Sequence, residues 1–123
     1  MPHASASTVG FRDLGLSDTM LAALDKAAYS DPTPVQAGII PRALEGVDVL
    51  GQARTGTGKT AAFAIPILEH VKPAKKGAPP QALVLVPTRE LAAQVRSELD
   101  LLEVAGARER LQRARRRRGG RTI

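Results

Sequence analysis

The chain has 123 residues, with 18 Lys and Arg against 12 Asp and Glu, no cysteine and three aromatic residues. This length allows one ordinary domain, and the core must consist of aliphatic side chains because aromatic ones are so few. The absence of cysteine excludes a disulfide scaffold and a cysteine-based zinc site, and it agrees with a reducing compartment. We therefore expect a cytoplasmic location.

No segment indicates secretion or membrane insertion. Residues 1–8 lack the basic and apolar regions of a secretory signal, and we expect them to be disordered. The longest apolar runs, Ala61–Ile65 and Ala82–Val86, have five residues each, far fewer than the ~20 that span a bilayer. We expect no membrane contact, and the sequence leaves the oligomeric state open.

The positive charge is concentrated at one end of the chain. Residues 1–103 carry 10 basic and 11 acidic side chains, whereas residues 104–123 carry eight arginines and one glutamate. Nucleic-acid binding by the body must therefore be argued from motifs. For residues 104–123 we consider two readings: a disordered Arg-rich tail that contacts phosphates without sequence preference, or a GC-rich gene read in a shifted frame from about Val104 onward.

Capping residues and apolar positions at helical spacing predict the helices. Ser17, Thr33 and Thr88 are placed as N-caps, and Pro34 with Gln36 adds a first-turn proline and a capping box. We expect helices over residues 17–28, 33–45, 59–70 and 88–102.

Short apolar runs predict strands between these helices. Residues 47–50 are β-prone, and Ala82–Val86 is a continuous apolar run of the kind that is buried on both faces of a parallel sheet. Alternating strands and helices predict an α/β fold. A parallel sheet of only two or three strands leaves backbone groups unpaired and Val and Leu side chains exposed, so we expect marginal stability or aggregation.

The strongest chemical signal is the segment ARTGTGKT at residues 53–60, which follows a predicted strand and opens a predicted helix. It matches the phosphate-loop pattern G-x-x-x-x-G-K-[ST] except at its first position. Glycines allow backbone N–H groups to surround an anion, the lysine reaches the β- and γ-phosphates, and the threonine hydroxyl binds Mg²⁺. The plain alternative is an ordinary strand-to-helix turn. The candidate residues are Ala53, Arg54, Thr55, Gly56, Thr57, Gly58, Lys59 and Thr60.

Gln36 has two possible roles. Taken alone, it is most simply the capping-box partner of Thr33. Its amide also presents a donor and an acceptor side by side, which match the N7/N6 edge of adenine. Phe11 and Tyr29 precede it and could supply a ring that stacks on the base.

These motifs resemble those of the DEAD-box RNA helicases. Phe11 together with Tyr29–Gln36 is similar to the Q motif of that family, and residues 53–60 are similar to motif I, where alanine is the usual first residue. Pro87–Ala92 (PTRELA) is similar to motif Ia. The three segments occur in the family's order over residues 9–103, with the Q motif region at 9–37 and part of the helicase ATP-binding domain at 40–103.

The resemblance implies an incomplete RecA-like domain that binds ATP and Mg²⁺ and contacts the RNA backbone. Gln36 would read the adenine, Tyr29 would pack against or near the base, and Phe11 would buttress that side of the pocket. Thr33 would help to shape the adenine site. Lys59 and Thr60 would act on the phosphates and the magnesium ion. The RNA-facing residues would be Pro87, Thr88 and Arg89. Without the resemblance, Thr88 would be interpreted as a helix N-cap and Arg89 as part of a solvated first helical turn.

The family's carboxylate motif, Asp-Glu-Ala-Asp, does not occur in the chain, which has no Asp-Glu dipeptide. Since positioning and charge stabilisation dominate phosphoryl transfer, we expect weak ATP hydrolysis, if any. Residues 119–123 are only faintly similar to the family's Gly-Gly motif. The alternatives are the N-terminal portion of an RNA helicase or a non-catalytic nucleotide- and RNA-binding fragment. A GTPase is disfavoured because no Asn-Lys-x-Asp motif is present.

Overall fold

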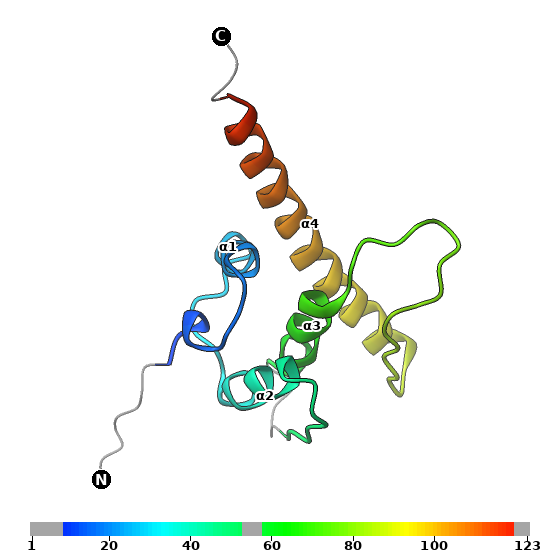
Figure 1. Cartoon of the computed structure of the whole chain (residues 1–123). Helices are drawn as coiled ribbons and strands as arrows, with labels where there is room; N and C mark the ends of the chain where they lie inside the picture. The colour runs from blue at the N-terminus through cyan, green and yellow to red at the C-terminus, as the bar shows by residue number, and fades with distance from the viewer. Residues whose placement is uncertain (1–8, 53–57, 120–123) are drawn as a thin grey trace.

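The computed structural model describes residues 9–52 and 58–119, with side chains described as far as Gly106. Figure 1 shows a helical arrangement in which α1 packs against α4, and α3 packs against both α2 and α4. In chain order, the elements are the 3-10 helix η1 (Phe11–Asp13) and the α-helices α1 (Asp18–Lys26), α2 (Pro34–Leu44), α3 (Lys59–His70) and α4 (Arg89–Gly119).

Helix α1 is capped from two directions. The Ser17 Oγ accepts a hydrogen bond from the backbone N–H of Met20 at 3.1 Å, as the sequence predicts. The Glu69 carboxylate, in the last turn of α3, accepts hydrogen bonds from the Ser17 N–H at 2.7 Å and from its Oγ at 2.8 Å. Ala28, just after the helix, has a left-handed φ of 67°. The start of α1 therefore depends on a residue 52 positions along the chain.

Helix α2 begins with the predicted capping box. The Thr33 Oγ1 accepts from the Gln36 N–H at 3.3 Å, and the Gln36 Oε1 accepts from the Thr33 N–H at 2.9 Å. Pro34 occupies the first helical position, where its missing N–H costs nothing. The helix ends at Leu44, and Gly46 follows with a φ of 87°. The prediction for this segment is confirmed to within one residue.

The core lies where the four α-helices and η1 meet. Its side chains are aliphatic apart from one aromatic ring, as the composition requires. Burial of a Leu or Ile side chain stabilises a fold by roughly 1.5–3 kcal/mol, so these contacts hold the helices together. Among the described residues, no buried side-chain nitrogen or oxygen lacks a hydrogen-bond partner. The core residues are Phe11, Leu14, Met20, Leu24, Ile40, Ala61, Ile65 and Leu102.

The described residues do not confirm the expected parallel sheet. Residues 47–50 and 82–86 are not assigned to strands, and Leu50, Leu83 and Leu85 are 91%, 83% and 84% exposed. The expectation that the second run is buried on both faces is therefore wrong here. The physical reason is that a strand gains its backbone hydrogen bonds only from a neighbouring strand, whereas a helix forms its own.

The described residues do not confirm the expected disordered Arg-rich tail at 104–119. These residues continue α4, which runs unbroken from Arg89 to Gly119 and not to Leu102 as expected. Arg, Ala, Gln and Leu are all strong helix formers, and no proline interrupts the segment. Across the part of the chain that the structure describes, no helix is both long enough and apolar enough to cross a membrane.

Candidate nucleotide-binding site

The predicted phosphate loop is described only at its C-terminal end. Ala53, Arg54, Thr55, Gly56 and Thr57 lie outside the described residues. Gly58 is the N-cap of α3, and Lys59 and Thr60 form its first turn, as the sequence predicts. The first N–H groups of an α-helix have no partner within the helix, and they carry the positive end of its dipole. The start of α3 is therefore suited to an anion.

Gly58 has a backbone that other residues adopt poorly, with a φ of 85° and a ψ of −12°. A Cβ atom at this position would lie 2.6 Å from the Thr33 Oγ1 and 2.9 Å from its Cγ2. Both observations require glycine: the first because left-handed φ strains other residues, the second because Thr33 occupies the space. The glycine thus lets the phosphate-loop end lie directly against the start of α2.

Gln36 makes the polar link between these two helix starts. Its Nε2 donates to the Gly58 carbonyl oxygen at 3.3 Å, and its Oε1 accepts from the Thr33 N–H at 2.9 Å. The side chain is buried, with 5% of its surface exposed. An amide has two N–H donors and two oxygen lone pairs, so one donor and one acceptor remain for a base. Capping and adenine recognition are therefore compatible roles.

The two aromatic residues before Gln36 contact each other. The rings of Phe11 and Tyr29 meet edge to face, with centroids 6.2 Å apart and an interplanar angle of 76°. Phe11 is buried in the core, and Tyr29 packs against that core while remaining partly exposed. Phe11 therefore contacts Tyr29 from the core side, and its expected support of the base pocket stays a prediction. A contact between Tyr29 and a base stays a prediction.

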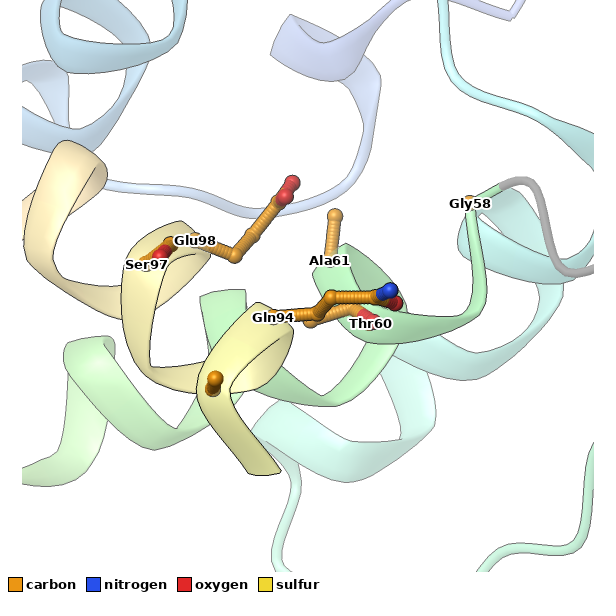
Figure 2. Close-up of a pocket in the computed structure, with 7 residues that line it drawn as sticks. Gly58, Thr60, Ala61, Gln94, Ser97 and Glu98 are labelled. Atoms are coloured by element: carbon orange, nitrogen blue, oxygen red, sulfur yellow. The ribbon is translucent and has the colours of Figure 1, made fainter. Parts of the chain in front are cut away.

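A hollow of about 470 Å³ lies between the start of α3 and the N-terminal third of α4. Figure 2 shows the Gln94 amide beside Thr60, and the Glu98 carboxylate pointing into the space near Ala61. Sequence reasoning missed the residues from α4. Their spacing places them on one polar face of a helix, but only the packing of α4 shows which neighbour they meet. The lining residues are Gly58, Thr60, Ala61, Ala93, Gln94, Ser97 and Glu98.

The predicted RNA-facing residues lie at the start of α4. Pro87, Thr88 and Arg89 are all exposed. The Thr88 Oγ1 accepts from the Leu91 N–H at 3.1 Å, which confirms the predicted N-cap. Its own O–H is then still able to donate, as are the first N–H groups of the helix. The structure therefore places an exposed set of donors here, apart from the buried contact at Gln36.

The described residues offer few metal ligands. They contain no group of three or more His, Asp or Glu side chains that could hold a metal ion. Thr60 lines the hollow, and its hydroxyl oxygen is of the hard type that Mg²⁺ prefers. A magnesium ion bound mainly by the oxygens of a triphosphate, with Thr60 as a protein ligand, fits this donor set.

The structure is similar to domains in solved helicase structures. It aligns with the RNA-helicase Prp28 from Chaetomium thermophilum bound to ADP at a TM-score of 0.73 and 38% identity, covering 80% of this chain and 24% of that one. It aligns with a DEAD box protein from Methanococcus jannaschii at a TM-score of 0.68 and 41% identity, covering 79% and 26%. These neighbours are RecA-like helicase domains.

Sequence comparison defines the family. The profile of the DEAD/DEAH box helicases matches residues 33–117. The DEAD-box ATP-dependent RNA helicase CshA of Bacillus cereus is 52% identical over 89 residues, which are 72% of this chain and 17% of that protein. The ATP-dependent rRNA helicase RRP3 of Meyerozyma guilliermondii is 52% identical over 92 residues, covering 75% and 19%. The chain belongs to the DEAD/DEAH box helicase family, and it spans less than a fifth of the length of these relatives.

Proposed function

We propose that this chain carries part of the nucleotide-binding site of an ATP-dependent RNA helicase, at the starts of α2 and α3, and that it binds ATP with magnesium. The observation that carries the proposal is the contact of Gln36 with the Gly58 carbonyl oxygen. This contact holds an adenine-selecting side chain against the end of the phosphate loop. The names of the relatives and the ADP bound to a structural neighbour support the same ligand.

Three described residues of this site, Lys59, Gln36 and Thr60, would each contact a different part of the nucleotide. The Lys59 side chain is exposed at the start of α3, where its charge reaches the β- and γ-phosphates. Gln36 uses its second donor and acceptor on the adenine edge. Thr60 would hold Mg²⁺, which when bound neutralises the charge of the phosphate oxygens. The residues outside the described part, Ala53–Thr57, complete the loop in this proposal.

RNA contact is proposed at the start of α4. Thr88 and Arg89 would donate to phosphate oxygens, together with the N–H groups of the first helical turn other than that of Leu91, which the Thr88 cap uses. These contacts carry no base information, so binding at this surface should depend on salt and not on sequence.

The second candidate function is binding without catalysis. It concerns a polypeptide of these 123 residues alone, which contain no Asp-Glu dipeptide and so no carboxylate motif of the family. RNA-stimulated phosphate release by the purified chain separates the two candidates. Turnover that Lys59→Ala abolishes would support a catalytic role for this chain, and nucleotide binding with no turnover would support the binding role.

Calorimetric titration with MgATP and MgGTP tests the nucleotide site. We expect ATP to bind at least tenfold more tightly than GTP, because a bidentate amide contact to adenine is worth ~1–3 kcal/mol of discrimination. Lys59→Ala should abolish measurable binding of both nucleotides. Gln36→Glu keeps the acceptor for the Thr33 N–H but removes the amide donor, so it should remove the preference for ATP.

The Gln36→Glu variant separates base reading from helix capping. If this variant keeps the native helix content and still prefers ATP, the adenine-reading role is wrong and Gln36 is a capping residue alone. If the unaltered chain, folded by circular dichroism, binds neither nucleotide, the proposed function itself is wrong.

A further inference from the structure

Helix α4 changes character part-way along its length. Within residues 89–106, where burial is described, its buried residues form the stripe that packs against the core: Val95, Leu102, Ala105 and Gly106. The positions that would continue this stripe, 109, 112 and 113, are Glu, Gln and Arg. The helix therefore has no apolar face for the core after Gly106, yet it continues to Gly119.

Residues 107–119, which we call the Arg-rich extension, carry a dense positive charge. They contain seven arginines, one glutamate and one leucine. At 1.5 Å per residue, this segment is about 20 Å long. Figure 1 shows it projecting beyond α1, with no other element of the described chain beside it.

Repulsion between like charges lowers the stability of the helix in the Arg-rich extension. Positions three and four apart share one side of a helix, and the sequence has arginine at positions 113, 116 and 117, a pattern that predicts repulsion between like charges. Glu109 is the single acidic residue available to offset them. A helix that is polar on all sides needs compensating charge pairs or a partner. A polyanion would remove the repulsion and stabilise the helix.

We propose that the Arg-rich extension is a second RNA-binding element, which contacts the phosphate backbone without reading sequence. Guanidinium groups match phosphate oxygens through two parallel hydrogen bonds. An anionic membrane fits less well, because a helix that lies in a membrane surface needs an apolar face, and the single leucine of the extension does not provide one.

The two proposed RNA contacts lie at opposite ends of one helix. Thr88 caps the N-terminal end of α4, and the extension forms the C-terminal end. With 31 residues, α4 is about 45 Å long. One RNA strand could therefore be held at two places along this helix. The extension does not depend on the nucleotide site, and it would bind RNA even if ATP binding failed.

Salt-dependent RNA binding by the full chain tests the extension. The probe is a 20-nucleotide single-stranded RNA with a fluorescent label, titrated at several salt concentrations. The variant replaces Arg115, Arg116 and Arg117 with Gln, which keeps helix propensity and removes three charges. We expect at least tenfold weaker binding at low salt, and a slope of log K against log salt that is smaller by about 2.

A matched variant removes three charges elsewhere. Lys72, Lys75 and Lys76 lie exposed in the loop before residue 82, and their replacement by Gln should leave the salt slope within about 0.5 of that of the unaltered chain. RNA should also raise the helix signal in circular dichroism of the unaltered chain, and raise it less in the arginine variant. Single-stranded DNA of the same length should bind with about the same affinity as the RNA, because the proposed contacts are to phosphates, which both nucleic acids share.

The following results would overturn the proposal. One is an arginine variant with an unchanged affinity and salt slope. Another is an equal loss in the lysine variant, which would show a general charge effect. A third is capture of the unaltered chain by anionic phosphatidylserine vesicles with no RNA binding. Titration with MgATP on the arginine variant should give the affinity of the unaltered chain, so failure of the extension and failure of the nucleotide site are distinguishable.

Discussion

Two helices of this chain begin with the same threonine cap in opposite surroundings. At the start of α2, Thr33 packs against Gly58, and its capping partner Gln36 is buried. At the start of α4, Thr88 makes the same type of bond to the Leu91 N–H, but it is exposed to solvent together with its neighbours. The same capping signal in the sequence thus lies in a buried, interhelical contact at the start of α2 and on an exposed surface at the start of α4.

The difference lies in what each cap touches beyond its own helix. Thr33 and Gln36 bind each other, and Gln36 also donates to the carbonyl oxygen of Gly58, the N-cap of α3. Thr88 satisfies only its own helix in the described contacts. A site that selects a small molecule needs side chains held in place by contacts with a second helix. A surface that binds the phosphate backbone of a nucleic acid needs only exposed hydrogen-bond donors.

The strongest way to break the α2 start is Gly58→Ala. The added Cβ would meet Thr33 at 2.6 Å in a left-handed backbone, so we expect a loss of about 3 kcal/mol in the free energy of unfolding and loss of ATP binding. Urea denaturation measures the first effect. Gly77→Ala is the matched control, because Gly77 also has a positive φ but no atom lies within 4 Å of the added Cβ.

The Gly77→Ala control should lose only the conformational part, about 1 kcal/mol. The remaining difference then measures the collision with Thr33. Equal losses in the two variants would show that Thr33 and Gly58 are not packed together in solution.

Alanine substitution of Thr33 and of Thr88 measures how much each N-cap contributes to the free energy of unfolding. Thr33→Ala should cost about 1.5 kcal/mol of unfolding free energy, since it breaks a partly buried capping box. Thr88→Ala should cost about 0.5 kcal/mol, because water can replace the exposed cap. Serine at either position should restore most of the loss. If Thr88→Ala proves the more destabilising variant in urea denaturation, the start of α4 is buried and the proposed RNA surface is wrong.

The smallest effect is expected at the exposed leucines. Replacement of both Leu83 and Leu85 by Lys should change the unfolding free energy by less than about 0.5 kcal/mol and reduce aggregation measured by light scattering. Val84→Lys, at a half-covered position, should cost about 1–2 kcal/mol. A loss above 2 kcal/mol from the leucine changes would mean that a strand or a helix covers them.

The sequence predicts the helices well and the strands poorly, for one physical reason. The signals at Ser17, Thr33 and Thr88 act within three residues, and all three caps are present. Residues 47–50 and 82–86 have the composition of strands, but the described structure provides no strand for them to pair with. In the Arg-rich extension, charge density favours disorder whereas helix propensity favours the helix that the structure has there.

The candidate site was predicted in part. Gln36 and Gly58 were both identified from motifs, and the structure brings them together at 3.3 Å. Gln94, Ser97 and Glu98 were not identified, because their position beside Thr60 depends on how α4 packs against α3. Local patterns reveal which residues can bind a phosphate, whereas contacts across the fold decide what surrounds it.

The carboxylate of Glu69 couples the stability of α1 to that of α3. Since this side chain completes the cap of α1 from the far end of α3, each helix is more stable when the other is formed. A ligand that orders the first turn of α3 also favours the ordered form of α1 by mass action. Nucleotide binding should therefore slow amide hydrogen exchange in α1, a helix that contributes no residue to the phosphate site.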